Sequence, residues 1–156
     1  MLLIDKKTKQ IDYCSAENIT SDVLTSTEPL ILKGLVADWP LTKLGRESSH
    51  KASEYLLQFY NNKPVNVALG EPSTKGRIFY SSDFTGFNYQ SLRVSMKILL
   101  DKLEQHSSDS SPPTIYMAST MVDHWLPEFR NENDLLLAPI NPLASIWIGN
   151  KTRIAA

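Results

Sequence analysis

Short apolar segments bounded by turn-forming residues recur along this sequence, and they constrain its fold most. The clearest is Pro64–Leu69, in which apolar and polar residues alternate with the period of a half-buried strand before Gly70. Four other segments have the length and composition of short strands: Leu30–Leu32, Arg77–Tyr80, Thr114–Ala118 and Ser145–Ile148. The pattern favours a fold that is mainly β-structure.

Three segments between these strands are typical of helices, and we expect them to flank the β-structure. Ser15–Leu24 is short, and Ser49–Asn61 places its apolar residues on one face. Ser91–Gln105 has the most regular helical spacing of the sequence. Its apolar stripe consists of Leu92, Met96, Leu99 and Leu103.

The composition excludes several classes of protein. A chain of 156 residues fits one domain, and 42% hydrophobic against 21% charged residues is enough apolar material for a core. The net charge of -1, without a basic stripe, argues against a nucleic-acid partner. No apolar run approaches the roughly 18 residues that span a membrane. A single cysteine, Cys14, is consistent with a reducing compartment, so we expect a cytoplasmic protein.

The residues themselves reveal no catalytic centre and no metal site. Neither glycine-rich nucleotide-binding motif is present, and no nucleophile elbow of the form G-x-S-x-G occurs. Asp123 and His124 are adjacent, so in a strand their side chains would point to opposite faces and would not share one ion. Glu132 and Asp134 are better explained as loop residues in water than as an acid and base pair.

Four segments in a fixed order carry a family resemblance: Pro29–Pro40, Gly76–Asn88, Ile115–Ser119 and Ser145–Asn150. In this order they resemble the cupin-like branch of the JmjC oxygenases, including the asparaginyl hydroxylase that acts on hypoxia-inducible factor. The resemblance covers nearly the whole chain. It implies one incomplete domain over residues 1–156, the N-terminal part of a double-stranded β-helix (jelly-roll).

The resemblance also implies an activity and its cofactors. Such enzymes use Fe(II) and 2-oxoglutarate to hydroxylate a protein or a small molecule, and two histidines with one carboxylate hold the iron. In the family, the strand that contains Trp147 leads shortly into the H-x-D iron motif, whereas this sequence ends at Ala156. We therefore expect the iron ligands to follow Ala156. On its own this fragment should be inactive and should bind neither cofactor tightly.

Three residues match cosubstrate-contacting positions of the resembling hydroxylase. Tyr116 matches a tyrosine whose hydroxyl reaches the 2-oxoglutarate carboxylate, and a sheet aromatic is its alternative role. Trp147 matches a large apolar residue of the cosubstrate pocket, and core packing is its alternative. Ile154 stands where that hydroxylase has a threonine, and an isoleucine donates no hydrogen bond. Anchoring of the cosubstrate would therefore depend more on Tyr116 and on groups after Ala156.

Two other functions stay open at this point. A non-catalytic cupin-like binding or scaffold domain would keep the fold without the chemistry. A short protein that completes its sheet by dimerisation is the third alternative, and the resemblance leaves a homodimer open. Because a double-stranded β-helix pairs early strands with late ones, residues 1–156 alone should expose strand edges and aggregate.

Overall fold

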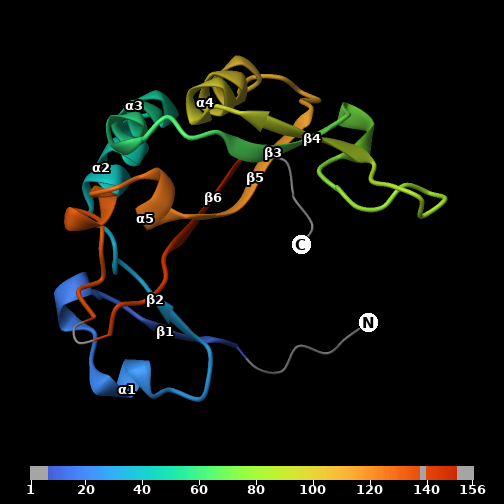
Figure 1. Cartoon of the computed structure of the whole chain (residues 1–156). Coiled ribbons are helices and arrows are strands. Elements are labelled where there is room, and N and C mark those ends of the chain that lie inside the picture. Colours follow the sequence, from blue (N-terminus) through green and yellow to red (C-terminus); the bar gives the residue numbers. More distant parts are fainter. Residues whose placement is uncertain (1–6, 138–139, 151–156) are drawn as a thin grey trace.

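The centre of the molecule is a four-stranded antiparallel sheet with the strand order β4-β3-β5-β6 (Figure 1). The computed structural model describes residues 7–137 and 140–150. The sheet strands are β3 (Val65–Gly70), β4 (Tyr89–Val94), β5 (Thr114–Met121) and β6 (Ser145–Gly149). The expected strands at Pro64–Leu69, Thr114–Ala118 and Ser145–Ile148 are therefore confirmed.

Helices cover one face of this sheet (Figure 1). The helices α3 (Ser49–Phe59) and α4 (Met96–Gln105) lie over this face, while α2 (Pro40–Glu47) packs against α3 and the single-turn α5 (Val122–Trp125) follows β5. Serine caps start the two longest: Ser48 accepts a hydrogen bond from the Lys51 amide at 3.1 Å, and Ser95 accepts one from the Ile98 amide at 3.3 Å. These caps fix where each helix begins.

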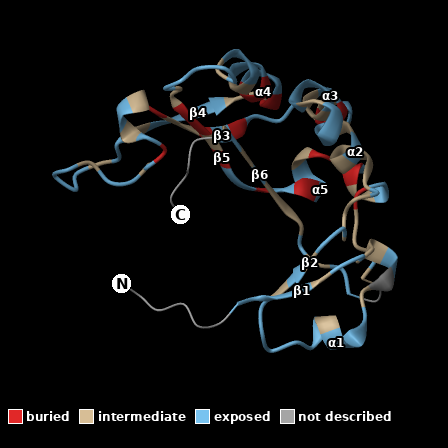
Figure 2. Ribbon diagram, turned by 180° about the vertical axis from the view of Figure 1, so that it is seen from behind, coloured by how far each residue is buried: buried red, intermediate tan, exposed pale blue. Residues whose placement is uncertain are grey.

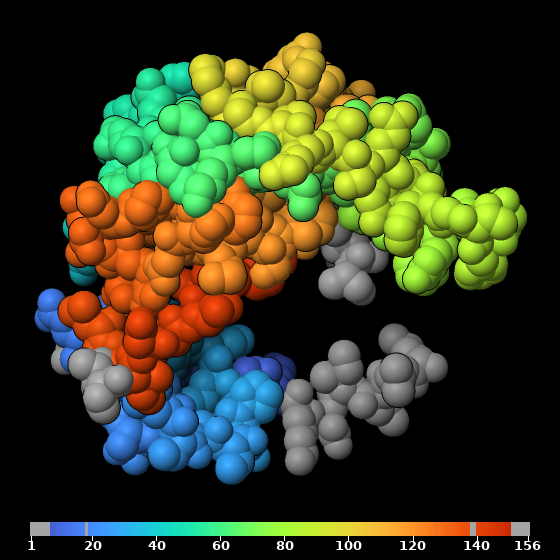
Figure 3. Space-filling model, viewed as in Figure 1, coloured from blue at the N-terminus to red at the C-terminus, as the bar shows by residue number. Residues whose placement is uncertain are grey.

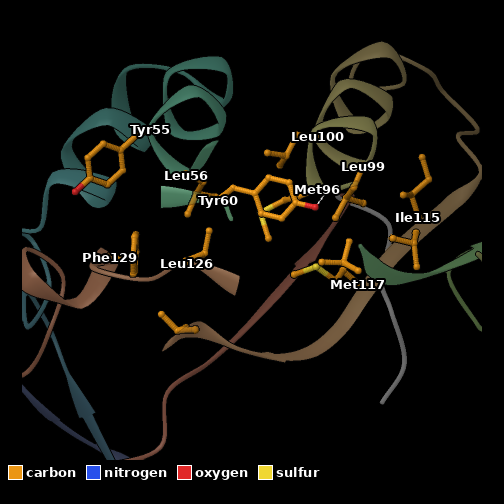
Figure 4. Packing of buried hydrophobic residues seen from close by; sticks show 13 residues of the cluster. Tyr55, Leu56, Tyr60, Met96, Leu99, Leu100, Ile115, Met117, Leu126 and Phe129 are labelled. Atoms are coloured by element: carbon orange, nitrogen blue, oxygen red, sulfur yellow. Dashed lines mark hydrogen bonds between the residues drawn. The ribbon is translucent and has the colours of Figure 1, made fainter. Parts of the chain in front are cut away.

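The hydrophobic core lies between the sheet and the helices (Figures 2 and 4). Met96 and Leu99 of α4 and Met117 of β5 are almost completely buried there. The Tyr60 ring packs into the same layer, and its hydroxyl accepts a hydrogen bond from the Met96 amide at 3.1 Å while donating to the Lys63 carbonyl. This contact joins the end of α3 to the start of α4.

A smaller N-terminal unit lies apart from the main sheet (Figure 1). Its strands β1 (Lys9–Ile11) and β2 (Leu30–Leu32) pair in parallel. Between them come a 3-10 turn over Ala16–Asn18 and the short α1 (Ser21–Leu24). The expected helix over Ser15–Leu24 is thus split in two. The strand at Leu30–Leu32 is confirmed but is not buried, since Ile31 is 42% exposed.

Two further expectations were wrong, and one helix was not predicted. Ser91–Gln105 is not one helix, because β4 occupies its start and α4 begins only at Met96. Arg77–Tyr80 forms no strand and contributes one isolated bridge, Tyr80 to Phe87, within the projecting loop of residues 76–88. The helix α2 was not expected. It follows Trp39-Pro40, and proline is well suited to a first helical turn because its missing N–H has no partner there.

Two short 3-10 turns complete the fold: Pro72–Thr74 after β3 and Phe129–Asn131 after α5. No helix in the described part of the chain is long and apolar enough to cross a bilayer.

Candidate functional site

The sheet has one face without helices, and we call it the open face. Side chains alternate along each strand, so residues between core positions point to this face. In β5, Tyr116 lies between Ile115 and Met117, which are buried in the core. In β6, Trp147 lies between Ile146 and Ile148, which pack against the core. By the sheet register, the open face carries Asn66, Ala68, Ser91, Arg93, Tyr116, Ala118, Trp147 and Gly149.

The open face looks toward a hollow in the molecule. Figure 3 shows this hollow between the main body, coloured green to orange, and the N-terminal unit, coloured blue. Figure 1 places the helices on the far side of the sheet from it. A ligand in the hollow would therefore meet the open face without displacing any helix.

Tyr116 stands near the middle of the open face with small neighbours on both sides. The register pairs it with Ala68 of β3 and Gly149 of β6. The ring is half-buried, and its hydroxyl makes no hydrogen bond to any described residue. A phenol with no partner beside small residues is a free donor for a carboxylate or another acceptor.

Trp147 is 56% exposed, so the structure does not place it in the core. It lies on the same face of the sheet as Tyr116, two residues before Gly149. Ile154, the third residue singled out from the sequence, lies outside the described residues. The structure therefore brings two of the three sequence-derived site residues to one face.

Arg93 is a site residue that the sequence interpretation missed. It belongs to β4, pairs in register with Asn66, and lies on the open face. It is exposed and forms no ion pair with any described residue. Because Ser91–Gln105 was interpreted as a helix, the alternation of Tyr89, Ser91 and Arg93 was not recognised. That alternation would have found Arg93, the cation of this face.

Two threonine hydroxyls, one of them buried, lie in contact at one end of the open face. Thr114 of β5 is fully buried, and its Oγ1 lies 3.1 Å from the Oγ1 of Thr74 and 3.1 Å from the Gly76 amide that donates to it. A Cβ on Gly70 would lie 3.2 Å from atoms of Thr74 and Ile78. Only glycine lets the loop after β3 approach the sheet this closely.

The other polar residues considered from the sequence have structural contacts away from the open face. Tyr55 donates to the Glu132 carboxylate at 2.8 Å, and Arg130 donates to Asp134 at 2.9 Å. Asp123 and His124 lie in the helix α5 and not in a strand, so the strand argument against their sharing an ion rested on the wrong structure.

Metal-binding side chains do not gather in the described residues. Across residues 7–137 and 140–150, no group of three His, Cys, Asp or Glu is placed to hold a metal ion. The open face therefore provides a hydrogen-bond donor (Tyr116), a cation (Arg93) and an exposed aromatic ring (Trp147). It provides no group of iron ligands among the described residues.

The comparisons with known proteins agree with the sheet and helix arrangement. A family model described as a cupin-like domain matches residues 16–156, almost the whole chain. The search of the curated proteins gives no match.

Proposed function

Because this chain belongs to the cupin-like domain family, we propose that it forms the N-terminal part of an Fe(II)- and 2-oxoglutarate-dependent oxygenase. In this proposal the four-stranded sheet is part of a double-stranded β-helix, similar to that of the asparaginyl hydroxylase that acts on hypoxia-inducible factor. The enzyme would hydroxylate a protein or a small molecule.

One observation carries the proposal: the open face combines a free phenol, an unpaired guanidinium and an exposed indole on a floor of small residues. The phenol is Tyr116, the guanidinium is Arg93 and the indole is Trp147. Ala68, Ser91 and Gly149 leave room above the floor. A small dicarboxylate such as 2-oxoglutarate suits this set, because charge-assisted hydrogen bonds hold carboxylates well.

The residues present would have distinct roles toward 2-oxoglutarate. Tyr116 would donate a hydrogen bond to one carboxylate, Arg93 would attract the dianion to the face, and Trp147 would exclude water from one side. When bound, 2-oxoglutarate supplies two electrons through oxidative decarboxylation. The chain's own contribution is therefore to bind and orient this cosubstrate.

Iron does not fit the described residues, since they bring no three suitable ligands together. Residues 151–156 add no histidine or carboxylate side chain. In the proposal, residues after Ala156 provide the iron ligands, and we derive no chemical step through the metal.

The test is succinate formation by the complete protein that contains this chain, with Fe(II) and 2-oxoglutarate. Tyr116→Phe should raise the KM for 2-oxoglutarate about tenfold, the value of one hydrogen bond to a charged group. Tyr80→Phe, which changes a tyrosine on the projecting loop, should leave the KM unchanged. Absence of Fe(II)-dependent succinate formation in the unsubstituted protein would overturn the proposal.

A non-catalytic cupin-like binding domain is the second candidate, because the open face could hold a dicarboxylate without any chemistry taking place. It predicts that the complete protein binds a dicarboxylate through Tyr116 but releases no succinate. Calorimetric titration with 2-oxoglutarate, beside the turnover assay, separates the two functions.

A further inference from the structure

A second possible binding site lies on the helix side of the sheet, away from the open face. It is a cavity of ≈ 500 Å³ between α3, α4 and the loop that follows α4, and we call it the helix-side cavity. Its volume falls within the range of about 300 to 1,000 Å³ that is typical of small-molecule sites. Its apolar lining comes from Leu56, Leu100, Leu103, Pro112 and Ile148.

The polar lining of the helix-side cavity contains two histidine–carboxylate pairs. The His50 Nδ1 lies 3.1 Å from the Glu104 carboxylate and so connects α3 to α4. The His106 Nδ1 lies 2.7 Å from the Asp109 carboxylate in the loop after α4. His50 also lies 3.4 Å from Glu54, one helical turn along α3.

The charged side chains of this lining are carboxylates and the histidines paired with them. Glu104 and Asp109 line the cavity, whereas no lysine or arginine is among its described lining residues. The nearby Lys51 is paired with Glu47, and Lys97 is paired with Asp101. An apolar interior with a carboxylate rim complements a ligand that has a hydrocarbon body and a positive head.

We propose that the helix-side cavity binds a small aliphatic amine, with its hydrocarbon chain against Leu56, Leu100 and Leu103 and its ammonium group at Glu104. Of the residues assigned to the open face, Gly149 also lines this cavity, and the proposal does not depend on the proposed oxygenase activity. Water-exposed ion pairs are weak, so burial of the hydrocarbon chain supplies most of the affinity and the carboxylate supplies selectivity for a cation.

Protonation of His50 should compete with the amine. Hydrogen bonding to Glu104, with the charges of Glu104 and Glu54, raises the pKa of His50 above its ordinary value. Glu54 on α3 and Glu104 on α4 are the charged groups that face His50. Below its pKa the imidazolium balances the Glu104 charge that would otherwise attract the ammonium group. Binding should therefore strengthen as the pH rises through the raised pKa of His50.

The test uses three probes of equal chain length: n-hexylammonium, hexanoate and hexanol. Each is titrated into the complete protein that contains this chain, and heat of binding and thermal midpoint are recorded. Hexylammonium should bind and raise the midpoint, while hexanoate should not. Equal binding of hexanoate and hexylammonium, or no binding of hexylammonium, would overturn the proposal.

Two variants and one control locate the site. Glu104→Gln keeps a hydrogen-bonding side chain but removes the charge, and should weaken hexylammonium binding about twofold to fivefold, as expected for a water-exposed ion pair. Ser53→Phe adds bulk to a half-buried lining position and should abolish binding of hexylammonium. Asp101→Asn, on α4 but outside the lining, is the matched control and should bind normally. Succinate formation, measured on the same proteins, reports separately on the open face.

Discussion

Asn133 donates a hydrogen bond from its Nδ2 to the Tyr55 hydroxyl at 2.9 Å, and this contact joins the segment after α5 to α3. The same amide also donates to the Phe129 carbonyl at 3.1 Å, while its Oδ1 accepts from the Leu41 amide of α2 at 3.2 Å. Asn133 is only 3% exposed. One buried side chain therefore fixes α2, α3 and the turn after α5 to one another.

Replacing Asn133 by alanine should destabilise this junction strongly. The change removes three hydrogen bonds and leaves the Leu41 amide without its partner, and one buried unsatisfied group costs about 1–3 kcal/mol. We expect a loss of about 3 kcal/mol in the free energy of unfolding, measured with urea. Asn131→Ala, at an exposed neighbouring position, is the control and should change stability little. Equal effects of the two variants would contradict the role assigned to Asn133.

Two glycines should respond to alanine in opposite directions. Gly34 has a φ of 86°, and a Cβ there would lie 3.3 Å from the Cys14 carbonyl oxygen. Gly45 lies within α2, where an added Cβ would make an ordinary contact with Ala52 at 3.8 Å. Gly34→Ala should lower the unfolding free energy by about 1–2 kcal/mol, whereas Gly45→Ala should raise it by about 0.5–1 kcal/mol. A stabilising Gly34→Ala would show that the turn after β2 is not constrained as described.

The projecting loop should keep its conformation to low pH. The Asp83 carboxylate accepts hydrogen bonds from the Ser81 hydroxyl at 2.6 Å, the Thr85 amide at 3.1 Å and the Thr85 hydroxyl at 2.9 Å. These bonds, led by that from Ser81, lower the pKa of Asp83 from 3.8 to about 2. Because the folded pKa lies below the unfolded one, this stabilisation is complete above pH 3.8 and disappears as the pH falls through about 2.

Carboxyl carbon NMR across this pH range measures the Asp83 titration directly. Ser81→Ala should move the pKa of Asp83 upward, toward its ordinary value. Ser110→Ala changes an exposed serine in a different loop and should leave it unmoved. An ordinary Asp83 titration in the unsubstituted protein would mean that the loop does not hold these bonds in solution.

Three of the four strands of the main sheet were predicted from the sequence, and β4 was not. Alternation identified β3, and length and composition identified β5 and β6. The family resemblance singled out Tyr116 and Trp147, and only the structure shows that they share a face. The prediction failed at β4, because Leu92 stands four residues before Met96, a spacing that also suits a helix. Leu92 is in fact paired with Val67 across the sheet. Pairing between distant strands decided the structure there, and local spacing does not encode that pairing.

The helix-side cavity could not be anticipated in the same way. His50, Glu104 and Asp109 stand far apart in the sequence or in polar surroundings, and each resembles an ordinary surface residue. Their proximity arises from the packing of α3 against α4. Tertiary packing, and no motif, produces this site.

The chain of residues 1–156 should self-associate through its open face. β4 and β6 form the two edges of the main sheet in the described part of the chain, and unpaired edges beside exposed apolar side chains favour association. Light scattering during size-exclusion chromatography should give a mass that exceeds 17.6 kDa and rises with concentration.

Trp147→Lys should reduce this association, because it places a charge on the open face. Phe84→Lys, which changes an exposed aromatic residue of the projecting loop, is the control and should not. A monodisperse 17.6 kDa species that melts cooperatively would contradict this prediction, because it would show that the chain is stable with its open face exposed to water.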